Sequence, residues 1–379
     1  MASVVADDQT IEKSLQKLVE LLRVGGAQIS DGLVIKCLAG NLSIEAPAVR
    51  RGNPLIRLPQ NCFVPLLAFR LALDGDEIVI SSASARLEKG VIAIAETMFE
   101  LYNLTSKVAH HRRASPWSLI VAHPELVPYV APPSREDFPF SAKDVRSGNK
   151  AKVTLASFLH SRLFEHRQSG QAPSIPVLLP TTDFFDHHWK GEPYSYAGNR
   201  AVLMRRSAPL AGQGDKCFAR YGLHDAYDSW MTYGFVDEDV PFVKSIATTV
   251  ELPGVGTIQL DDASAPDERG IPRILSKKRN HLVASAVMIP GPDTRRALRR
   301  TLRMLINKLT GGQQNWRDLV IDAERQIIDA NIAYYAELKT CLAGLVVDNA
   351  AHSSIQANFV RLCEGQVTRL RNYLSYGER

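Results

Sequence analysis

The densest group of side chains that could line a reaction site lies between residues 217 and 242, in CFARYGLHDAYDSWMTYGFVDEDVPF. Three tyrosines supply hydroxyl groups there, and a glycine directly follows two of them, in the steps Tyr221-Gly222 and Tyr233-Gly234. Aromatic faces exclude water and hydroxyl groups orient a polar reactant, so this stretch is the first candidate for a site. Its rings include Tyr221, Tyr227, Trp230, Tyr233, Phe235 and Phe242.

Two further segments, LASFLHSRLFEHR and LPTTDFFDHH, place charged and imidazole side chains close together. An arginine can make a charge-assisted fork to a carboxylate. The two adjacent histidines point to different sides and fit no metal-ligand spacing, so we expect no metal. The polar candidates in these segments are Arg162, His166, Asp183, Asp186, His187 and His188.

Short β-rich blocks separated by helices must position these segments. Residues 8–24 repeat apolar side chains at helical spacing and end at a Gly-Gly pair, which predicts a helix. Residues 33–64 and about 175–262 are typical of short strands, with a helical insertion at about 83–170 between them. Neither β block has enough apolar area to stand alone, so the two must come together. After an Asp-, Ala- and Pro-rich linker, residues 266–379 are predicted to be helical.

Composition excludes several classes of protein. A chain of 379 residues, 45% hydrophobic and 22% charged, is long enough for two domains and is neither disordered nor fibrous. Its five cysteines are scattered without a C-x-x-C pair, which argues against disulfides and zinc and for a reducing, cytoplasmic location. We expect no secretory signal and no membrane span. The net charge of +5 is too mild and uneven to predict nucleic-acid binding.

Five segments occur in an order and at spacings that point to a known family. NLSIEAPAVRRGNPLIRLP carries Gly52 and Pro59, LASFLHSRLF carries an arginine, and LPTTDFFDHH follows the pattern P-x-x-D-x-x-N-H. GDKCFARYG then follows G-E-x-x-x-x-x-Y-G, and YGFV precedes EDVPF. Together, over nearly the whole chain, these segments resemble the SET-domain methyltransferases of the Rubisco large-subunit methyltransferase type.

The resemblance implies an α+β fold. A SET-type β-sheet fold with a knotted C-terminal segment and a helical insertion is expected at residues 1–265. An all-helical substrate-binding domain is expected at residues 266–379. A monomer is expected because the C-terminal helices already have one another to pack against.

The resemblance also implies an activity: transfer of a methyl group from S-adenosyl-L-methionine to a side-chain nitrogen of a protein or peptide substrate, leaving S-adenosyl-L-homocysteine. Lysine is the default acceptor. The methyl group must meet the nucleophile in line, within about 3–3.5 Å. An acceptor lysine must first lose its proton, and burial beside the sulfonium lowers its pKa from the reference value of about 10.4.

Roles for individual residues follow from the same resemblance. Tyr221 falls at the position of the catalytic tyrosine, where oxygen atoms accept the polarised C–H groups of the methyl. Arg162 falls at the position that binds the cofactor carboxylate, and Tyr233 at a wall of the substrate channel. The implied cofactor-binding residues are Asn41, Arg162, Asp186, His187, Tyr221 and Phe235. The implied substrate-binding residues are His166, Asp183, Tyr196 and Tyr233.

The sequence departs from the family pattern around this site. Asp186 stands in place of an asparagine, Leu42 in place of the second glycine of a cofactor-binding turn, and Asp225-Ala226 in place of Ser-Asn. Two alternatives therefore stay open. In the first alternative, the acceptor is a histidine or an asparagine amide of a ribosomally made peptide under maturation, and Asp186, Asp225 or His166 acts as the base. In the second alternative, the chain is a non-catalytic SET scaffold that binds a partner.

A basic run near the start of the helical tail has two interpretations. Charge runs on helices are usually solvated faces. This run could instead hold an acidic stretch of a protein substrate. Its members are Arg295, Arg296, Arg299, Arg300 and Arg303.

Overall fold

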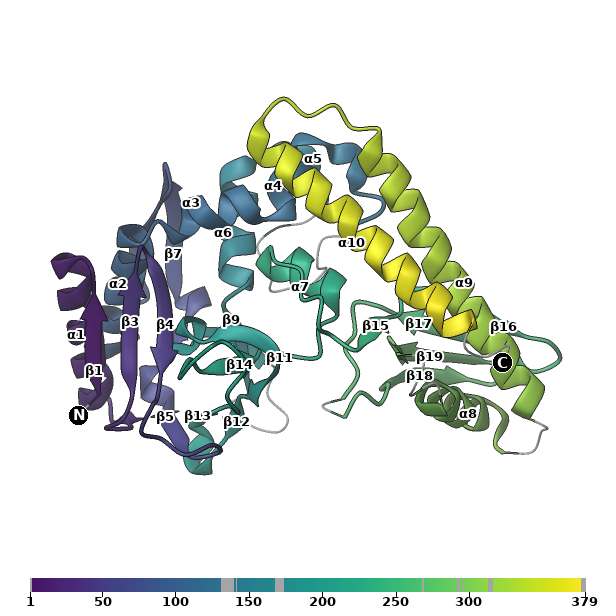
Figure 1. Cartoon of the computed structure of the whole chain (residues 1–379), viewed down its shortest axis with the longest axis horizontal. Helices are drawn as coiled ribbons and strands as arrows, with labels where there is room; N and C mark the ends of the chain where they lie inside the picture. The colour runs from purple at the N-terminus through teal and green to yellow at the C-terminus, as the bar shows by residue number, and fades with distance from the viewer. Residues whose placement is uncertain are drawn as a thin grey trace. The chain divides into compact units, whose positions relative to one another are not determined.

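The computed structural model describes residues 2–130, 140, 142–167, 174–267, 269–291, 294, 296–312 and 316–375 (Figure 1). The chain forms two compact units. The first is built mainly from Met1–Arg113 and Ser147–Gly222, and the second from Leu223–Arg379 with Ala114–Arg135 and Ser141–Arg146. This division differs from the expected boundary between residues 265 and 266, because the chain leaves the first unit at Ala114, returns to it, and leaves it again at Leu223.

The first helix forms where its cap and its apolar spacing predict it. Helix α1 spans Gln9–Val24, close to the expected 8–24. The Asp8 carboxylate accepts hydrogen bonds from the backbone N–H groups of Thr10 at 2.7 Å and Ile11 at 3.1 Å, which caps the helix. The buried face of α1 packs against α2 (Lys89–Leu104). Its buried apolar side chains are Ile11, Leu15, Leu18, Val19 and Leu22.

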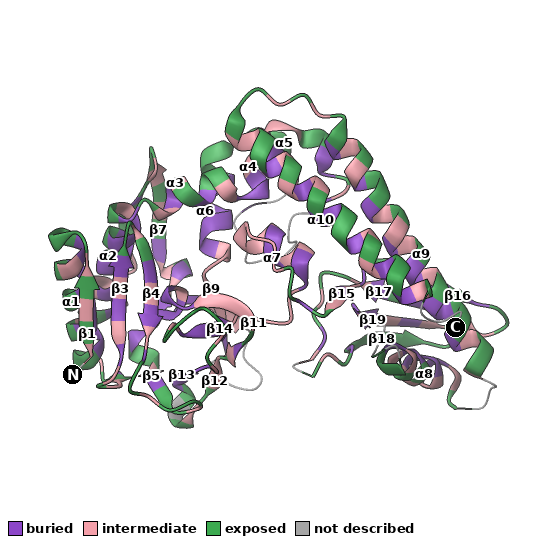
Figure 2. Ribbon diagram, viewed as in Figure 1, coloured by how far each residue is buried: buried purple, intermediate pink, exposed green. Residues whose placement is uncertain are grey.

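Five small sheets form the β part of the first unit, with strand orders β1-β3-β4, β6-β10-β9, β11-β14, β12-β13-β5-β2 and β7-β8. The two β-rich blocks come together, since β5 from the first pairs antiparallel with β13 from the second. In β3 and β4 buried side chains alternate with less buried ones, as Figure 2 shows in purple and pink. The strands are β1 (Ser3–Ala6), β2 (Gln28–Ile29), β3 (Val34–Leu38), β4 (Asn41–Glu45), β5 (Pro54–Leu58), β6 (Val64–Pro65), β7 (Phe69–Asp74), β8 (Glu77–Ala83), β9 (Leu163–Arg167), β10 (Ser174–Leu178), β11 (Asp186–Pro193), β12 (Ser195–Tyr196), β13 (Val202–Arg205) and β14 (Phe218–Arg220).

Helices occupy much of the expected insertion at 83–170. Besides α2, they are α3 (Lys107–Ala114), α4 (Pro116–Ala122), α5 (Ala142–Arg146) and α6 (Lys150–His160). Helix α5 lies in the Pro- and charge-rich stretch at 131–150, of which residues 131–139 and 141 lie outside the described residues. The insertion is therefore helical but divided, because α4 and α5 belong to the second unit.

The second unit contains both helices and strands, so the α+β class is confirmed but an all-helical C-terminal domain is not. Its sheet has the order β16-β17-β19-β18, and β15 pairs with β20. Strands β18 to β20 lie beyond residue 265, where short apolar runs between charged residues gave little strand signal. The strands are β15 (Phe242–Lys244), β16 (Thr248–Leu252), β17 (Gly256–Asp261), β18 (Ile274–Lys278), β19 (His281–Ser285) and β20 (Met288–Pro290).

The helical C-terminal region agrees with the sequence from Arg296 onward. Helix α9 packs against both α8 and α10, and α7 contacts α10. Among the described residues, no helix combines the length and the apolar character that crossing a bilayer requires. The helices are α7 (Ala226–Tyr233), α8 (Arg296–Thr310), α9 (Trp316–Ala343) and α10 (Ala350–Ser375).

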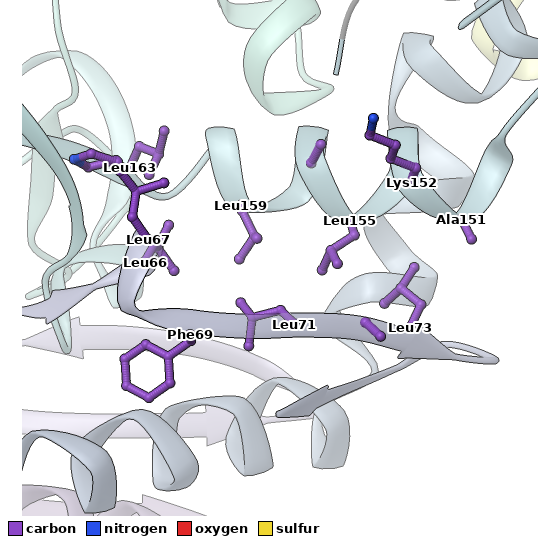
Figure 3. Close-up of a pocket in the computed structure, with 13 residues that line it drawn as sticks. Leu66, Leu67, Phe69, Leu71, Leu73, Ala151, Lys152, Leu155, Leu159 and Leu163 are labelled. Carbon is purple, nitrogen blue, oxygen red and sulfur yellow. The ribbon is translucent and has the colours of Figure 1, made fainter. Parts of the chain in front are cut away.

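An apolar cavity of about 520 Å³ lies in the first unit between α6 and β7. Figure 3 shows Leu155 and Leu159 of α6 pointing toward β7, which carries Leu71 and Leu73. None of the residues predicted for the active site lines this cavity. It is a feature of the scaffold that stands apart from the site described next.

Candidate active site

A parallel strand pair brings two of the predicted segments together in the first unit. Asp186 of β11 pairs with Phe218 of β14, and His187 pairs with Ala219. The end of LPTTDFFDHH therefore lies beside the end of CFARYG, and Tyr221 follows β14 directly. This juxtaposition is the center of the candidate site.

Tyr221 is held by contacts at both its hydroxyl group and its backbone. The hydroxyl donates a hydrogen bond to the Phe185 carbonyl, and the backbone N–H donates to Nδ1 of His187 at 3.3 Å. The Tyr221 ring lies 5.0 Å from the His187 ring and stacks on Tyr194 at 6.3 Å and 16°. The Tyr194 hydroxyl in turn donates to the Thr182 carbonyl at 3.0 Å. A tyrosine oxygen fixed beside a backbone carbonyl can orient polarised C–H groups.

The backbone that presents the Phe185 carbonyl is strained. Thr181 adopts φ 72° and ψ −10°, a left-handed conformation that is a genuine outlier for a β-branched residue. Its side chain is fully buried, and a single 3₁₀ turn at Thr182–Phe184 follows it. Such strain costs on the order of 1–3 kcal/mol and persists where the surrounding structure enforces it, often at functional sites. The strain at Thr181 supports assigning function to this turn.

Aromatic rings extend from Tyr221 to two of the predicted substrate-binding residues. Phe164 lies 6.3 Å from the Tyr194 ring and 5.8 Å from the Tyr196 ring, and His166 lies 6.1 Å from Tyr196. Tyr196 is half exposed, whereas His166 is buried and bonded through Nε2 to the Gln60 amide at 3.1 Å. Sequence reasoning missed Phe164, whose alternation with His166 on β9 was its only signal. We name these rings the aromatic row: Tyr221, Tyr194, Phe164, Tyr196 and His166.

The Arg162 guanidinium contacts several groups of the protein itself. Its Nε lies 3.5 Å from Oδ2 of Asp183, and Nη1 donates to the Phe158 carbonyl at 3.1 Å and to the Ser161 hydroxyl at 2.6 Å. The guanidinium also sits over the Phe158 ring at 3.8 Å and the Tyr102 ring at 5.4 Å. Arg162 and Asp183 are thus partners, which the sequence assigned separately to cofactor and substrate. Their predicted contacts with those ligands stay predictions.

Lys107 is a second cation in this region, and sequence reasoning missed it. Burial lowers the pKa of its ammonium, and repulsion from Arg162 lowers it further, while Asp183 and Asp186 act in the opposite direction. A lone lysine at the start of a helix is usually solvated, so the sequence held no signal for it. Lys107 is a compact donor that could bind a ligand carboxylate.

The turn that carries Asn41 lies near the start of α3. A Cβ atom added to Gly40, which has φ +75°, would meet the Thr105 carbonyl oxygen at 3.3 Å. Asn41 is exposed at the start of β4, and Leu42 is only 3% exposed in the core. The leucine in place of the family's second glycine therefore packs inward and leaves the surface of the turn open. Asn41 directly follows Gly40, and Lys107 lies two residues after Thr105.

Asp186, the residue that replaces the family's asparagine, forms an ion pair with Lys216. Its side chain is 49% exposed. An exposed pair of this kind contributes little to stability. The Lys216 ammonium compensates the carboxylate charge that the substitution brings to this edge of the site.

His111 is a buried neutral imidazole beside the charged cluster. Burial, and secondly repulsion from Arg162, lower the pKa of His111 from 6.5 to about 3. Its Nε2 lies 2.9 Å from the Ser157 hydroxyl, and its ring meets Phe158 edge-on at 5.7 Å. The uncharged His111 imidazole therefore packs against α6, which carries both Ser157 and Phe158.

This depressed pKa predicts an acid-labile first unit. Below pH 6.5 the unfolded state binds a proton at His111 that the folded state does not, so stability present above pH 6.5 is lost as the pH falls toward 3. At pH 4 the loss is about 3 kcal/mol from this residue alone. His111→Gln keeps a polar contact with Ser157 and removes the titration. Urea unfolding of both proteins at pH 7 and pH 4 should show a smaller acid loss in the variant; equal losses would contradict the assignment.

Tyr233 and Phe235, also predicted for the site, belong to the second unit. Their rings stack at 5.7 Å and 21°, and the Tyr233 hydroxyl lies 3.4 Å from Nε2 of His224. Burial raises the pKa of the Tyr233 hydroxyl, and the charge of Asp228 raises it further. The pair forms a defined aromatic surface, and its approach to Tyr221 stays a prediction.

Tyr227 and Trp230 of the 217–242 stretch have structural roles. The Tyr227 hydroxyl lies 2.8 Å from the Tyr334 hydroxyl, and Trp230, 2% exposed, packs near Phe359. Asp225, considered above as a base, caps α7 by accepting from the Asp228 N–H at 2.9 Å. These residues build the core of the second unit. Among the described residues there is no cluster of metal-ligating side chains.

Comparisons with known proteins return structures but no sequences. The sequence matches no family model and no curated protein. A SET domain of LSMT bound to lysine and AdoHcy is similar at 13% identity and a TM-score of 0.41, over 96% of this chain and 91% of that one. Rubisco LSMT bound to sinefungin and monomethyllysine is similar at 13% identity and a TM-score of 0.43, over 96% and 92%. At this identity the site has to be judged on its own residues.

Proposed function

We propose that this chain is a SET-type methyltransferase that moves a methyl group from S-adenosyl-L-methionine to a side-chain nitrogen of a protein or peptide, with lysine as the default acceptor. The observation that carries the proposal is the Tyr221 hydroxyl bound to the Phe185 carbonyl, beside His187. The cations Arg162 and Lys107 and the order of the five sequence segments add support. We place the protein in the cytoplasm as a monomer.

Methyl transfer depends more on orienting the two reactants and excluding water than on side chains that act as general acids or bases. The bound cofactor supplies an electrophilic methyl on its sulfonium, so the acceptor nitrogen forms the N–C bond while the C–S electron pair returns to sulfur. The Tyr221 oxygen and the Phe185 carbonyl are fixed in direction by their hydrogen bond, which suits them to hold polarised C–H groups. The rings of Tyr194 and His187 lie beside the Tyr221 ring and exclude water from it. The acceptor ammonium loses its proton to water before attack.

Lysine is favoured over an amide acceptor because each candidate base is already engaged. Asp186 pairs with Lys216, and the buried His166 is bonded to Gln60. Asp225 caps α7 in the second unit and accepts from the Lys244 N–H at 2.8 Å. An amide nitrogen needs a strong base within hydrogen-bond reach, and a lysine needs only deprotonation.

The first test is isothermal titration of the full chain with S-adenosyl-L-homocysteine and with 5′-methylthioadenosine, which lacks the aminocarboxyl group. We assign the cofactor carboxylate to Lys107, because Arg162 is held by Asp183. Lys107→Met should weaken S-adenosyl-L-homocysteine binding about 10- to 100-fold, the value of one charge-assisted hydrogen bond. The affinity for 5′-methylthioadenosine should not change.

Lys89→Met is the matched control, since Lys89 is an exposed lysine at the start of α2 in the same unit. It should leave both affinities unchanged. If Lys107→Met weakens the binding of both ligands equally, the contact between Lys107 and the cofactor carboxylate is refuted, but the proposed methyltransferase activity is not. Failure of the unmodified chain to bind either ligand would refute the methyltransferase and leave the non-catalytic scaffold.

A further inference from the structure

The second unit carries a groove of about 300 Å³ between α8 and α9 whose rim is almost entirely arginine. Helix α8 buries Leu298, Leu302 and Leu305 on one side, so its other side is free to present charge. The α8 sequence RALRRTLRMLINKLT contains no acidic residue. The rim is formed by Arg296, Arg299, Arg300 and Arg303 of α8 and Arg317 of α9. Arg295 of the basic run lies outside the described residues.

These arginines carry a charge that the described chain compensates only in part. Arg299 pairs with Glu324 at 2.9 Å, and Glu324 is buried and also accepts from the Tyr373 hydroxyl at 2.6 Å. Within the described ranges this is the one ion pair that a rim arginine makes. Five guanidiniums against one carboxylate leave an excess of four positive charges. Arginine stays protonated at any relevant pH, so this excess of positive charge attracts a ligand of the opposite sign.

The floor of the groove is apolar, which a solvated charged face would not need. Ile321 is 44% exposed there, next to the buried Val320. Trp316 also lines the groove, and the Arg303 guanidinium lies 4.1 Å from the center of its ring. That guanidinium covers a face of the ring, so the aliphatic side chains supply the contact surface for a ligand. Arginine and tryptophan around an apolar pocket are typical of the residues that dominate binding energy at interfaces.

We propose that this arginine groove is a docking site for an acidic protein segment in which an apolar side chain is flanked by glutamates or aspartates. The apolar side chain fills the floor at Val320 and Ile321, and the flanking carboxylates pair with the rim. A nucleic acid fits less well, because binding to single strands relies on aromatic faces that stack bases. The proposal does not depend on methyl transfer, since no residue of the groove belongs to the predicted active site.

The experiment measures fluorescence anisotropy of a labelled peptide with one leucine between two runs of three glutamates, added to the full chain. Binding should weaken as salt rises. The double variant Arg300→Glu/Arg317→Glu should bind at least 10-fold more weakly, and so should Ile321→Ser. Arg371→Glu, which reverses an exposed charge on α10 outside the groove, should bind as the unmodified chain does.

Three results would overturn the proposal: no binding of the peptide, equal binding by the double variant, or equal binding of a peptide with serine in place of leucine. A single-stranded oligonucleotide of equal charge that competes at lower concentration would assign the groove to nucleic acid instead. Circular dichroism of each variant establishes that it is folded. Because the cofactor titration uses other residues, failure of either proposal leaves the other standing.

Discussion

Replacing Tyr221 with phenylalanine is expected to lower the rate of methyl transfer at least about 100-fold while the first unit stays folded. The substitution removes one oxygen and its hydrogen bond to the Phe185 carbonyl. Loss of one oriented polar group at a reaction center typically costs 10²–10³ in rate. The lost hydrogen bond should cost only about 1 kcal/mol of unfolding free energy. The measurement is transfer of a radiolabelled methyl group to proteins of a cell extract.

Tyr194→Phe is the matched control, because its ring stacks on Tyr221 but its hydroxyl donates to the Thr182 carbonyl instead. It should retain most of the activity. Binding of S-adenosyl-L-homocysteine to Tyr221→Phe should also be retained, which separates chemistry from binding. Full activity in Tyr221→Phe would sink the catalytic assignment.

Replacing Arg162 with alanine is expected to destabilise the first unit by about 3–5 kcal/mol. The change removes the guanidinium that lies 3.5 Å from the Asp183 carboxylate, which is 13% exposed, and it also removes the packing of that guanidinium on Phe158. The loss of the nearest cation from a largely buried carboxylate is one of the few causes of so large a loss. Urea unfolding followed by circular dichroism measures it.

Two variants make this result interpretable. Arg70→Ala removes an exposed arginine of β7 and should change stability by less than about 0.5 kcal/mol. Asp183→Asn added to Arg162→Ala should recover part of the loss, since the buried charge is then gone. A loss below 1 kcal/mol in Arg162→Ala would mean that Asp183 does not rely on Arg162. The arginine would then again be a candidate for the cofactor carboxylate.

The sequence predicted those parts of the site that depend on local order along the chain. Tyr221, His187 and Asp186 lie on segments with recognisable spacing, and the structure brings those segments together as β11 and β14. The pairing of the two β blocks was predictable for a physical reason, because neither could bury enough apolar area alone. The burial of Leu42 could not be predicted from the motif, since it depends on which face of β4 meets the core.

The parts that escaped prediction depend on contacts between distant residues. Arg162 and Asp183 looked like separate ligand contacts, and only tertiary packing shows that they pair. Lys107 has no motif, and its pKa is lowered first by burial and then by Arg162, which is far away in sequence. Tyr227 and Trp230 share the aromatic stretch with Tyr221 but pack against α9 and α10, so sequence proximity overstated the size of the site.

The excursion of the chain at Ala114 bears on how the protein is made. Helix α4 and the turn after it belong to the second unit, where Nε1 of Trp117 donates to the Met231 carbonyl at 2.9 Å and Tyr334 donates to the Tyr129 carbonyl. The last two residues are 205 positions apart. At a synthesis rate of about 5–20 residues per second, Tyr129 waits roughly 10–40 s for its partner to leave the ribosome. During that time the apolar side chains of α4 lack the later segments against which they pack. We therefore expect a chaperone that acts on nascent chains to bind this segment.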